Sequence, residues 1–190
     1  MTNVTDTLTQ PDHVHDVHHI CEDTKCHHDA QASVKQRLDQ AKQYCKENGL
    51  RFTQLREQVY KLVLEADKPI GAYDLLGIMQ EKNILATNKT NNKANSKAKT
   101  IAPPTVYRSL DFLLEVGFIH QLASINAFVP CCHPREKHIA AFLICSNCQT
   151  VQECNNKAVR QLMDSTKKEI GFAVETSTIE MTGLCQKCQR

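Results

Sequence analysis

Two Cys-x-x-Cys pairs constrain this chain more than any other feature of its sequence. Cys145 and Cys148 form the first pair, and Cys185 and Cys188 form the second. A Cys-x-x-Cys turn presents two thiolates to one ion, and two such pairs complete the tetrahedral sulfur shell of a structural zinc site. Paired disulfides are the competing interpretation. We predict that the four cysteines bind a structural zinc ion.

The length and the hydrophobicity of the chain favour a small cytosolic protein. A chain of 190 residues suits one or two small domains. No apolar run is long enough to span a bilayer, and the N-terminus lacks the features of a secretory signal. We therefore expect a cytoplasmic location without a membrane partner. Because cytosolic thiols stay reduced, the ten cysteines are predicted to be metal ligands or buried residues.

Charge is unevenly distributed along the chain. Residues 1–30 carry one Lys against six acidic residues, a balance of −5. Residues 31–120 carry fourteen Lys or Arg against nine acids, a balance of +5, and residues 121–190 carry eight against six, a balance of +2. The middle segment is thus the one suited to a polyanion such as nucleic acid, although the bias is mild.

Residues 1–30 form a polar tail that is predicted to be disordered, because it has few residues that build a core. It nevertheless holds most of the histidines, together with two cysteines. Such a tract can bind zinc, copper or nickel loosely, and the alternative is a solvated tail without a specific role. The residues concerned are His13, His15, His18, His19, Cys21, Cys26, His27 and His28.

Three short amphipathic helices are predicted before residue 82. The first begins near Ala32 and stops before Gly49, the second has Thr53 as its N-cap, and the third runs from Ala72 to Glu81. Residues 83–102 are polar, basic and of low complexity, so we expect a flexible loop there. It is either a tolerated surface insertion, which we favour, or a set of nonspecific phosphate contacts.

A fourth helix is predicted to begin at Pro103–Pro104 and to end at Gly117. One face is apolar, and its N-terminal N–H groups are expected to point toward a phosphate. Arg108 could reach guanine in a major groove, which is the layout of a recognition helix. The alternative is an ordinary amphipathic helix with a solvated outer face. That outer face is predicted to carry Thr105, Tyr107, Arg108 and Ser109.

Strands and a further helix are predicted in the rest of the chain. Strands at 118–120 and 127–129, joined by a turn, would complete a winged helix over residues 31–129. Residues 130–190 are predicted to form a second, α+β domain. Its elements are strands at 139–144, 150–153 and 172–181 and a helix from about Asn156.

A second group of metal-binding side chains lies between residues 120 and 153. Its members are soft or borderline ligands that suit zinc and also cobalt. They are His120, Cys131, Cys132, His133, His138 and Glu153.

These residues together resemble the ferric uptake regulator family, and most closely its zinc uptake regulator branch. The resemblance covers about residues 33–188. It rests on Arg51-Phe52-Thr53, on Ala72-Tyr73-Asp74-Leu75-Leu76, on the run from Pro104 to Leu113, on His120 and on both Cys-x-x-Cys pairs.

The resemblance implies a dimeric, metal-dependent transcription repressor with a winged helix that binds operator DNA and a C-terminal domain that dimerises. It implies a regulatory zinc site of His120, Cys131, His138 and Glu153 beside the structural site, which makes two zinc ions per subunit. Cys132 or His133 remains an alternative to Cys131. Tyr73 and Arg108 match DNA-contacting positions, with Thr105 and Tyr107 on the same recognition helix. The His/Asp cluster of the iron- and peroxide-sensing branches is replaced by 139–142, Ile-Ala-Ala-Phe.

Because the four regulatory ligands are spread over both predicted domains, zinc is expected to select one domain orientation, the form that binds DNA. The resulting hypothesis is a zinc-responsive repressor of zinc uptake genes. The alternatives are a regulator that senses another metal or the redox state, and a zinc buffer or chaperone that works through the tail. Enzymatic hydrolysis is not expected, since both shells are complete without water.

Overall fold

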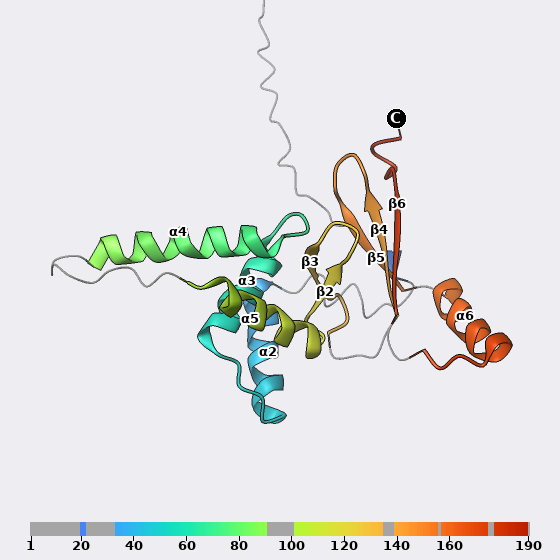
Figure 1. The fold of residues 1–190 in the computed structure, drawn as a ribbon, viewed down its shortest axis with the longest axis horizontal. Helices are drawn as coiled ribbons and strands as arrows, with labels where there is room; N and C mark the ends of the chain where they lie inside the picture. Colours follow the sequence, from blue (N-terminus) through green and yellow to red (C-terminus); the bar gives the residue numbers. More distant parts are fainter. Residues whose placement is uncertain are drawn as a thin grey trace, which may run out of the picture.

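Four helices and a hairpin come first along the chain, and a small sheet follows. The computed structural model describes residues 20–21, 33–90, 101–134, 139–155, 157–174 and 177–189. The elements of the first part are α2 (Val34–Glu47), α3 (Gln54–Glu65), α4 (Ala72–Thr90), α5 (Pro103–Glu115), β2 (Ile119–Leu122) and β3 (Ala127–Pro130). Figure 1 shows α2, α3 and α5 packed together beside this hairpin, with α4 extending away from them. The first part is therefore a winged helix.

Local sequence signals account for most boundaries of these helices. The hydroxyl oxygen of Thr53 accepts a hydrogen bond from the Arg56 N–H at 3.3 Å, which confirms the predicted N-cap. Ser33 caps α2 in the same way. Gly49 and Gly117 have φ values of 66° and 74°, the left-handed conformation that ends α2 and α5.

The prediction that the third helix ends at Glu81 is wrong. Helix α4 continues to Thr90, so residues 83–90 are helical rather than part of a flexible loop. No Gly or Pro lies between Gly77 and Pro103, and Ile-Leu-Ala at 84–86 favours continued helix. The rest of the predicted loop, residues 91–100, lies outside the described residues.

The winged helix is built around one hydrophobic core. Leu75 of α4 and Phe118 after α5 are fully buried in it. Phe118 stacks on Tyr60 with ring centroids 5.4 Å apart, so the aromatic residues join α3 to the start of the hairpin. The other fully buried members include Val59, Val63, Val106, Leu110 and Leu113, at the helical spacing that predicted these faces.

The second part is a four-stranded sheet with the order β1-β5-β4-β6. Its strands are β1 (Ile20–Cys21), β4 (Ala140–Cys145), β5 (Val151–Asn155) and β6 (Thr178–Gly183). Strand β4 pairs antiparallel with β5 and parallel with β6. Helix α6 (Lys157–Ser165) continues into one π-helical turn, η1 (Thr166–Ile170), at the far end of the molecule in Figure 1.

Two predictions for the second part need correction. Strand β6 begins at Thr178 rather than Phe172, because β4 begins at Ala140, which pairs with Thr178, and offers earlier residues no partner. In the tail, Ile20–Cys21 form β1, which pairs with β5 at Cys154 and Asn155, so these two residues are not disordered. The other tail residues lie outside the described part of the chain.

The hairpin lies against the sheet and joins the two parts. Leu122 of β2 is buried in a small cluster with Ala140, Phe142 and Ile144 of β4. The Glu180 carboxylate of β6 accepts hydrogen bonds from the backbone N–H groups of Ala123 and Ser124 at the hairpin turn, at 2.7 and 3.0 Å. The hairpin is thus positioned by both parts. In the described part of the chain, every helix lacks the length or the hydrophobicity for a bilayer crossing.

Candidate metal centres and nucleic-acid interface

The first candidate centre consists of Cys145, Cys148, Cys185 and Cys188, and we call it the four-cysteine centre. Because β4 and β6 are parallel and Cys145 pairs with Gly183, the two strands end at the same edge of the sheet. Each Cys-x-x-Cys turn starts there. One ligand atom from each of the four cysteines lies within 4.8 Å of the others, as the spacing predicted.

The sulfur positions fit one tetrahedral ion. Cys148 Sγ lies 3.7 Å from Cys185 Sγ. Zinc–sulfur bonds of about 2.3 Å at a tetrahedral angle place sulfurs about 3.8 Å apart. The predicted competitor, a pair of disulfides, is not formed, since all four cysteines are free and a disulfide needs an S–S distance of about 2.05 Å.

Hydrogen bonds favour the thiolate forms of Cys145 and Cys148. The Cys185 N–H donates to Cys145 Sγ at 3.3 Å, and this bond, with others from the Cys148 and Asn147 backbone, lowers the pKa of Cys145 to about 6. The Thr150 hydroxyl and N–H lower the pKa of Cys148. A hydrogen bond with Cys185 raises the pKa of Cys188 to about 11. The sulfurs thus share protons, which a metal ion would displace.

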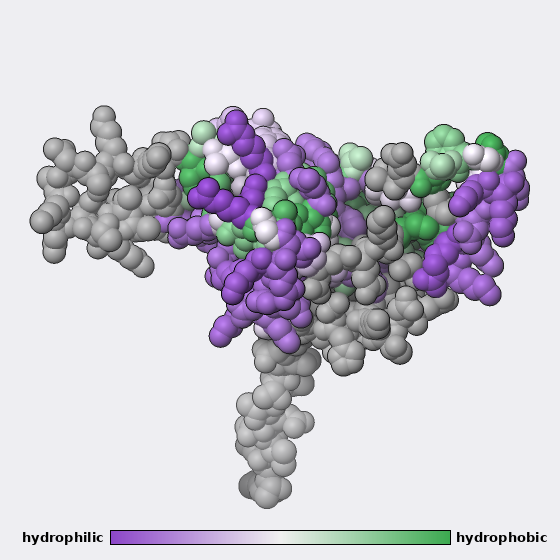
Figure 2. Space-filling view, turned by 90° about the horizontal axis from the view of Figure 1, so that it is seen from below, coloured by the Kyte–Doolittle hydropathy of each residue, from purple (hydrophilic) through white to green (hydrophobic). Residues whose placement is uncertain are grey.

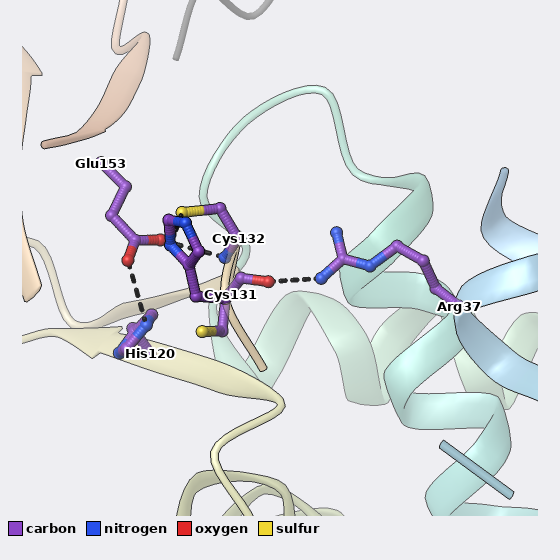
Figure 3. A network of polar contacts seen from close by, with 6 residues as sticks. Arg37, His120, Cys131, Cys132 and Glu153 are labelled. Carbon is purple, nitrogen blue, oxygen red and sulfur yellow. Dashed lines mark hydrogen bonds and ion pairs between the residues drawn. The ribbon is translucent and has the colours of Figure 1, made fainter. Parts of the chain in front are cut away.

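The second candidate centre consists of His120, Cys131 and Glu153, and we call it the hairpin–sheet centre. His120 lies on β2, Cys131 follows β3, and Glu153 lies on β5, as Figure 3 shows. His120 Nε2 is 3.6 Å from Glu153 Oε1, and ligand atoms of all three lie within 4.8 Å. The Cys131 N–H donates to the Phe118 carbonyl at 3.0 Å, which fixes Cys131 against the start of β2.

This centre is shielded from water. Cys131 is fully buried, and Glu153 is 4% exposed. Burial disfavours the charged form of His120, but its hydrogen bonds with Cys131 and Glu153 outweigh burial and raise the pKa of His120 to about 9. An imidazole, a thiolate and a carboxylate are ligands that zinc accepts, so the three residues fit a zinc ion. The predicted fourth ligand, His138, lies outside the described residues.

Cys132 and His133 also reach Glu153. Cys132 Sγ is 3.0 Å from His133 Nδ1, and the Cys132 N–H donates to Glu153 Oε2 at 3.1 Å. The ligand atoms of Cys132, His133 and Glu153 lie within 4.8 Å of one another. The structure therefore places the alternative ligands beside Cys131 and within reach of the same carboxylate.

Sequence reasoning missed two residues that hold the hairpin–sheet centre in place. Arg37 of α2 is buried, and its guanidinium donates to the Cys131 carbonyl (Figure 3). Its position three residues after Val34, on the apolar stripe of α2, was a detectable signal. Glu180 is the second. Burial opposes its charge, but the hydrogen bonds from Ser124 and Ala123 lower its pKa. No sequence pattern indicated Glu180.

The predicted recognition helix, α5, exposes two of the four residues expected on its outer face. Tyr107 and Arg108 are exposed, and Tyr73 of α4 is 74% exposed. Partial desolvation and the neighbouring Tyr73 hydroxyl raise the pKa of Tyr107, so the two phenols lie together. Thr105 is half-buried at the start of the helix.

Two expectations for this helix are wrong. Ser109 is buried, and its hydroxyl donates to the Thr105 carbonyl at 2.9 Å, because it lies one turn after Thr105 and faces the core. The helix N-terminus also offers few N–H groups, since Pro103 and Pro104 have none and the Thr105 N–H donates to the Ala102 carbonyl at 2.9 Å. A phosphate at this end must therefore be bound by side chains.

Comparison with known proteins identifies the family. The model of the ferric uptake regulator family matches residues 47–182. This range includes helix α5, all three residues of the hairpin–sheet centre, and Cys145 and Cys148 of the four-cysteine centre. The chain belongs to the ferric uptake regulator family. Within the family, the zinc uptake regulation protein of Escherichia coli strain K12 is 36% identical over 157 residues, which are 82% of this chain and 83% of that protein.

Solved structures of the ferric uptake regulator family share this fold. A zinc uptake regulator complexed with zinc and DNA has a TM-score of 0.68 and 34% identity, covering 84% of this chain and 97% of that one. The holo form of a protein named XcZur has a TM-score of 0.64 and 38% identity, covering 80% and 96%. The predicted resemblance and fold class are confirmed.

Proposed function

We propose that this member of the ferric uptake regulator family is a zinc-responsive repressor that binds the operators of zinc uptake genes as a homodimer. The observation that carries the proposal is the hairpin–sheet centre, whose ligands come from the winged helix, the segment after it and the sheet. The similarity to a zinc uptake regulator solved with zinc and DNA supports the same reading. Its role is regulatory rather than enzymatic, and its place is the cytoplasm.

The ligands couple metal binding to the arrangement of the hairpin. His120 on β2 and Glu153 on β5 approach to 3.6 Å only while the hairpin lies against the sheet. A zinc ion bound there adds bonds that exist in this arrangement alone and so favours it over others. We propose His138 as the fourth ligand, although it lies outside the described residues.

The free energy required is within reach of such a site. Moving a population from about 1% to about 99% competent takes about 5.5 kcal/mol of differential binding. Structural zinc sites yield about 10–16 kcal/mol in total. Only part of the zinc-binding free energy of the hairpin–sheet centre therefore needs to differ between the DNA-binding arrangement and the others. The four-cysteine centre binds the second zinc ion of each subunit and stabilises the sheet domain.

Side chains on α4 and α5 contact the operator. Arg108 reads a base edge in the major groove, because it is exposed one turn from the start of α5. Tyr73 and Tyr107, which lie together, and Thr105 contact the backbone beside it. These side chains supply the phosphate contacts that the proline-rich helix start lacks.

The homodimer forms through the C-terminal domain, taken as residues 130–190. This domain leaves large apolar side chains exposed after α6, including Ile170 at 75% and Phe172 at 62%. Figure 2 shows hydrophobic surface at the end of the molecule that α6 occupies. Such surface on a small domain marks an interface with a partner, here a second copy.

Fluorescence anisotropy with promoter DNA from a zinc-import operon tests the proposal. Wild type should bind with zinc and release the DNA when a chelator is added. Glu153→Gln should lose the zinc response, whereas Cys154→Ala should keep it. Cys154 is the neighbouring buried residue of β5, and it packs in a different cluster with Ala141 and Val159. Binding that is unchanged by chelator, or a Glu153→Gln variant that responds like wild type, would overturn the proposal.

A further inference from the structure

We propose that Cys132, His133 and Glu153 bind a second borderline metal ion beside the hairpin–sheet centre, with the Glu153 carboxylate bridging the two ions. The proposal adds to the proposed function, because the zinc response requires only the ion at His120, Cys131 and Glu153.

The two oxygens of Glu153 face two different sets of ligands. Oε1 lies 3.6 Å from His120 Nε2, and Oε2 accepts a hydrogen bond from the Cys132 N–H at 3.1 Å. Figure 3 shows the carboxylate between His120 on one side and Cys132 on the other. Each carboxylate oxygen has two lone pairs, so Oε2 can keep this hydrogen bond and still bind a metal.

The second set of ligands is already gathered. Cys132 Sγ and His133 Nδ1 are 3.0 Å apart, and one ligand atom from each of the three residues lies within 4.8 Å of the others. Bonds of about 2.0–2.3 Å from zinc to N, O and S place ligands of one shell about 3.2–3.8 Å apart. Only small side-chain movements are therefore needed to form the shell.

Ligand charge in the pocket is compatible with a second ion. Cys132 and His133 are 1% and 3% exposed, and Glu153 and Cys131 are equally well buried. With both thiols ionised, Cys131, Cys132 and Glu153 carry a charge of −3, which one divalent ion leaves at −1 and two ions bring to +1. Unpaired buried charge is costly, so a second ion allows Cys132 to act as a thiolate and not as a neutral thiol.

The chemistry of the second ion follows from its ligands. A thiolate, an imidazole and a carboxylate select zinc or cobalt over magnesium or calcium. Carboxylate-bridged ions in two-metal sites lie about 3.5–4 Å apart, which one Glu153 side chain can span. The described residues supply three ligands, which leaves a fourth position for water or a small anion. We therefore expect weaker binding here than at the four-cysteine centre.

Cobalt titration of the full-length chain tests the second ion. Wild type, Cys132→Ala and His133→Gln share the same tail, so tail binding cancels in the comparison. Wild type should bind one more cobalt ion per chain than either variant, and Cys132→Ala should lose the charge-transfer absorption of one cobalt–thiolate bond. Cys154→Ala, a second buried cysteine nearby, should bind as many ions as wild type. Equal stoichiometry in wild type and both variants would overturn the proposal.

Electron paramagnetic resonance gives a test that needs no variant. Two cobalt ions that share Glu153 should be magnetically coupled, so the signal per cobalt should fall when the last ion of the pair binds to wild type. A signal that grows in proportion to every added ion would overturn the bridge. Thermal melting of Cys132→Ala and His133→Gln checks that both are folded. If one variant is unfolded, the other variant and the wild-type resonance spectrum decide.

Discussion

The two metal centres differ in which parts of the chain they join. The four-cysteine centre lies at one edge of a single sheet, where Cys148 and Cys185 are partly exposed. The hairpin–sheet centre is buried, and it takes ligands from the winged helix, the segment after it and the sheet. A metal ion in the four-cysteine centre would link two turns of the same domain. A metal ion in the hairpin–sheet centre would restrain the hairpin against the sheet. Of the two centres, only this one therefore couples metal binding to the arrangement of the two parts.

The largest effect should come from breaking the four-cysteine centre. Cys148→Ser should remove the structural ion and, with it, much of the about 10–16 kcal/mol that such an ion contributes to folding. Metal analysis should show one zinc fewer per chain, and circular dichroism and size-exclusion chromatography should show an unfolded or monomeric C-terminal domain. Cys45→Ala, which removes a buried cysteine of α2, should keep its zinc. A folded dimeric Cys148→Ser protein with full zinc content would contradict the structural role of the four-cysteine centre.

Breaking the hairpin–sheet centre should abolish regulation and spare the fold. Glu153→Gln removes an anionic ligand but keeps an acceptor for the Cys132 N–H. Zinc affinity of this centre should fall more than about 100-fold, since changes outside a ligand shell already cost about 10–100-fold. Competition with a fluorescent zinc chelator measures the affinity, and the melting temperature without metal, taken above pH 9 where His120 is neutral, should stay close to wild type. A large loss of metal-free stability would make this centre structural as well.

The metal-free hairpin–sheet centre should depend on pH through His120. Its pKa is about 9 in the folded chain against 6.5 for the free side chain, so the folded state binds this proton more tightly. The resulting stabilisation is complete below pH 6.5 and is lost as the pH rises to about 9. Urea unfolding of chelated wild type should therefore show a decline across this range that is absent from His120→Gln. Identical pH profiles would mean that the contacts of His120 with Cys131 and Glu153 contribute nothing to the stability of the metal-free fold.

The proposed DNA interface separates the two centres further, because we expect DNA binding to depend on the hairpin–sheet centre although the interface contains neither centre. Arg108→Ala should cost about 1–3 kcal/mol and relax the preference at one operator position. Binding to a panel of operators with single base changes measures this. Lys61→Ala, which removes an exposed charge of α3 paired with Glu65, should leave the preference unchanged. Uniform weakening on every operator would show that Arg108 contacts phosphate instead.

The smallest effect should come from the hydrogen bonds that hold the hairpin turn. Glu180→Gln keeps one acceptor for the Ala123 and Ser124 N–H groups but loses the charge, so we expect a cost of about 0.5–1.5 kcal/mol. Operator affinity at saturating zinc should change little, while more zinc should be needed for half-maximal binding. An unchanged zinc requirement would show that the turn is positioned without Glu180.

The sequence indicated which candidate ligands lie close together better than it indicated the residues that surround them. The spacing of Cys145 and Cys148 indicates one pair of ligands, and a tetrahedral zinc shell needs a second pair. The four-cysteine centre could therefore be predicted without knowing that β6 runs parallel to β4. His120 and Glu153 came from the family resemblance, because nothing local shows that β2 lies against the sheet. Arg37 and Glu180 act through backbone groups distant in sequence, which side-chain patterns do not reveal.

The two errors in the fold have different causes. Polar composition suggested a loop after Glu81, yet α4 continues, since helix formation needs only the absence of Gly and Pro and adequate propensity. Alternation from Phe172 suggested a long strand, but strand length depends on a partner, and β4 supplies one only from Thr178. The strand boundary therefore depends on a partner that the local sequence does not contain, whereas the helix boundary follows from local helix propensity.

Strand β6 has a mechanical consequence. Glu180 in its middle holds the hairpin turn, and Gly183 at its end receives the Ser146 N–H at 2.8 Å, two residues before Cys185. Strand β6 therefore connects the edge of the sheet that carries the four-cysteine centre to the tip of the wing. Load applied to either end is carried along its backbone, and loosening the cysteine turns would let the wing tip drift even with every ligand around His120 intact.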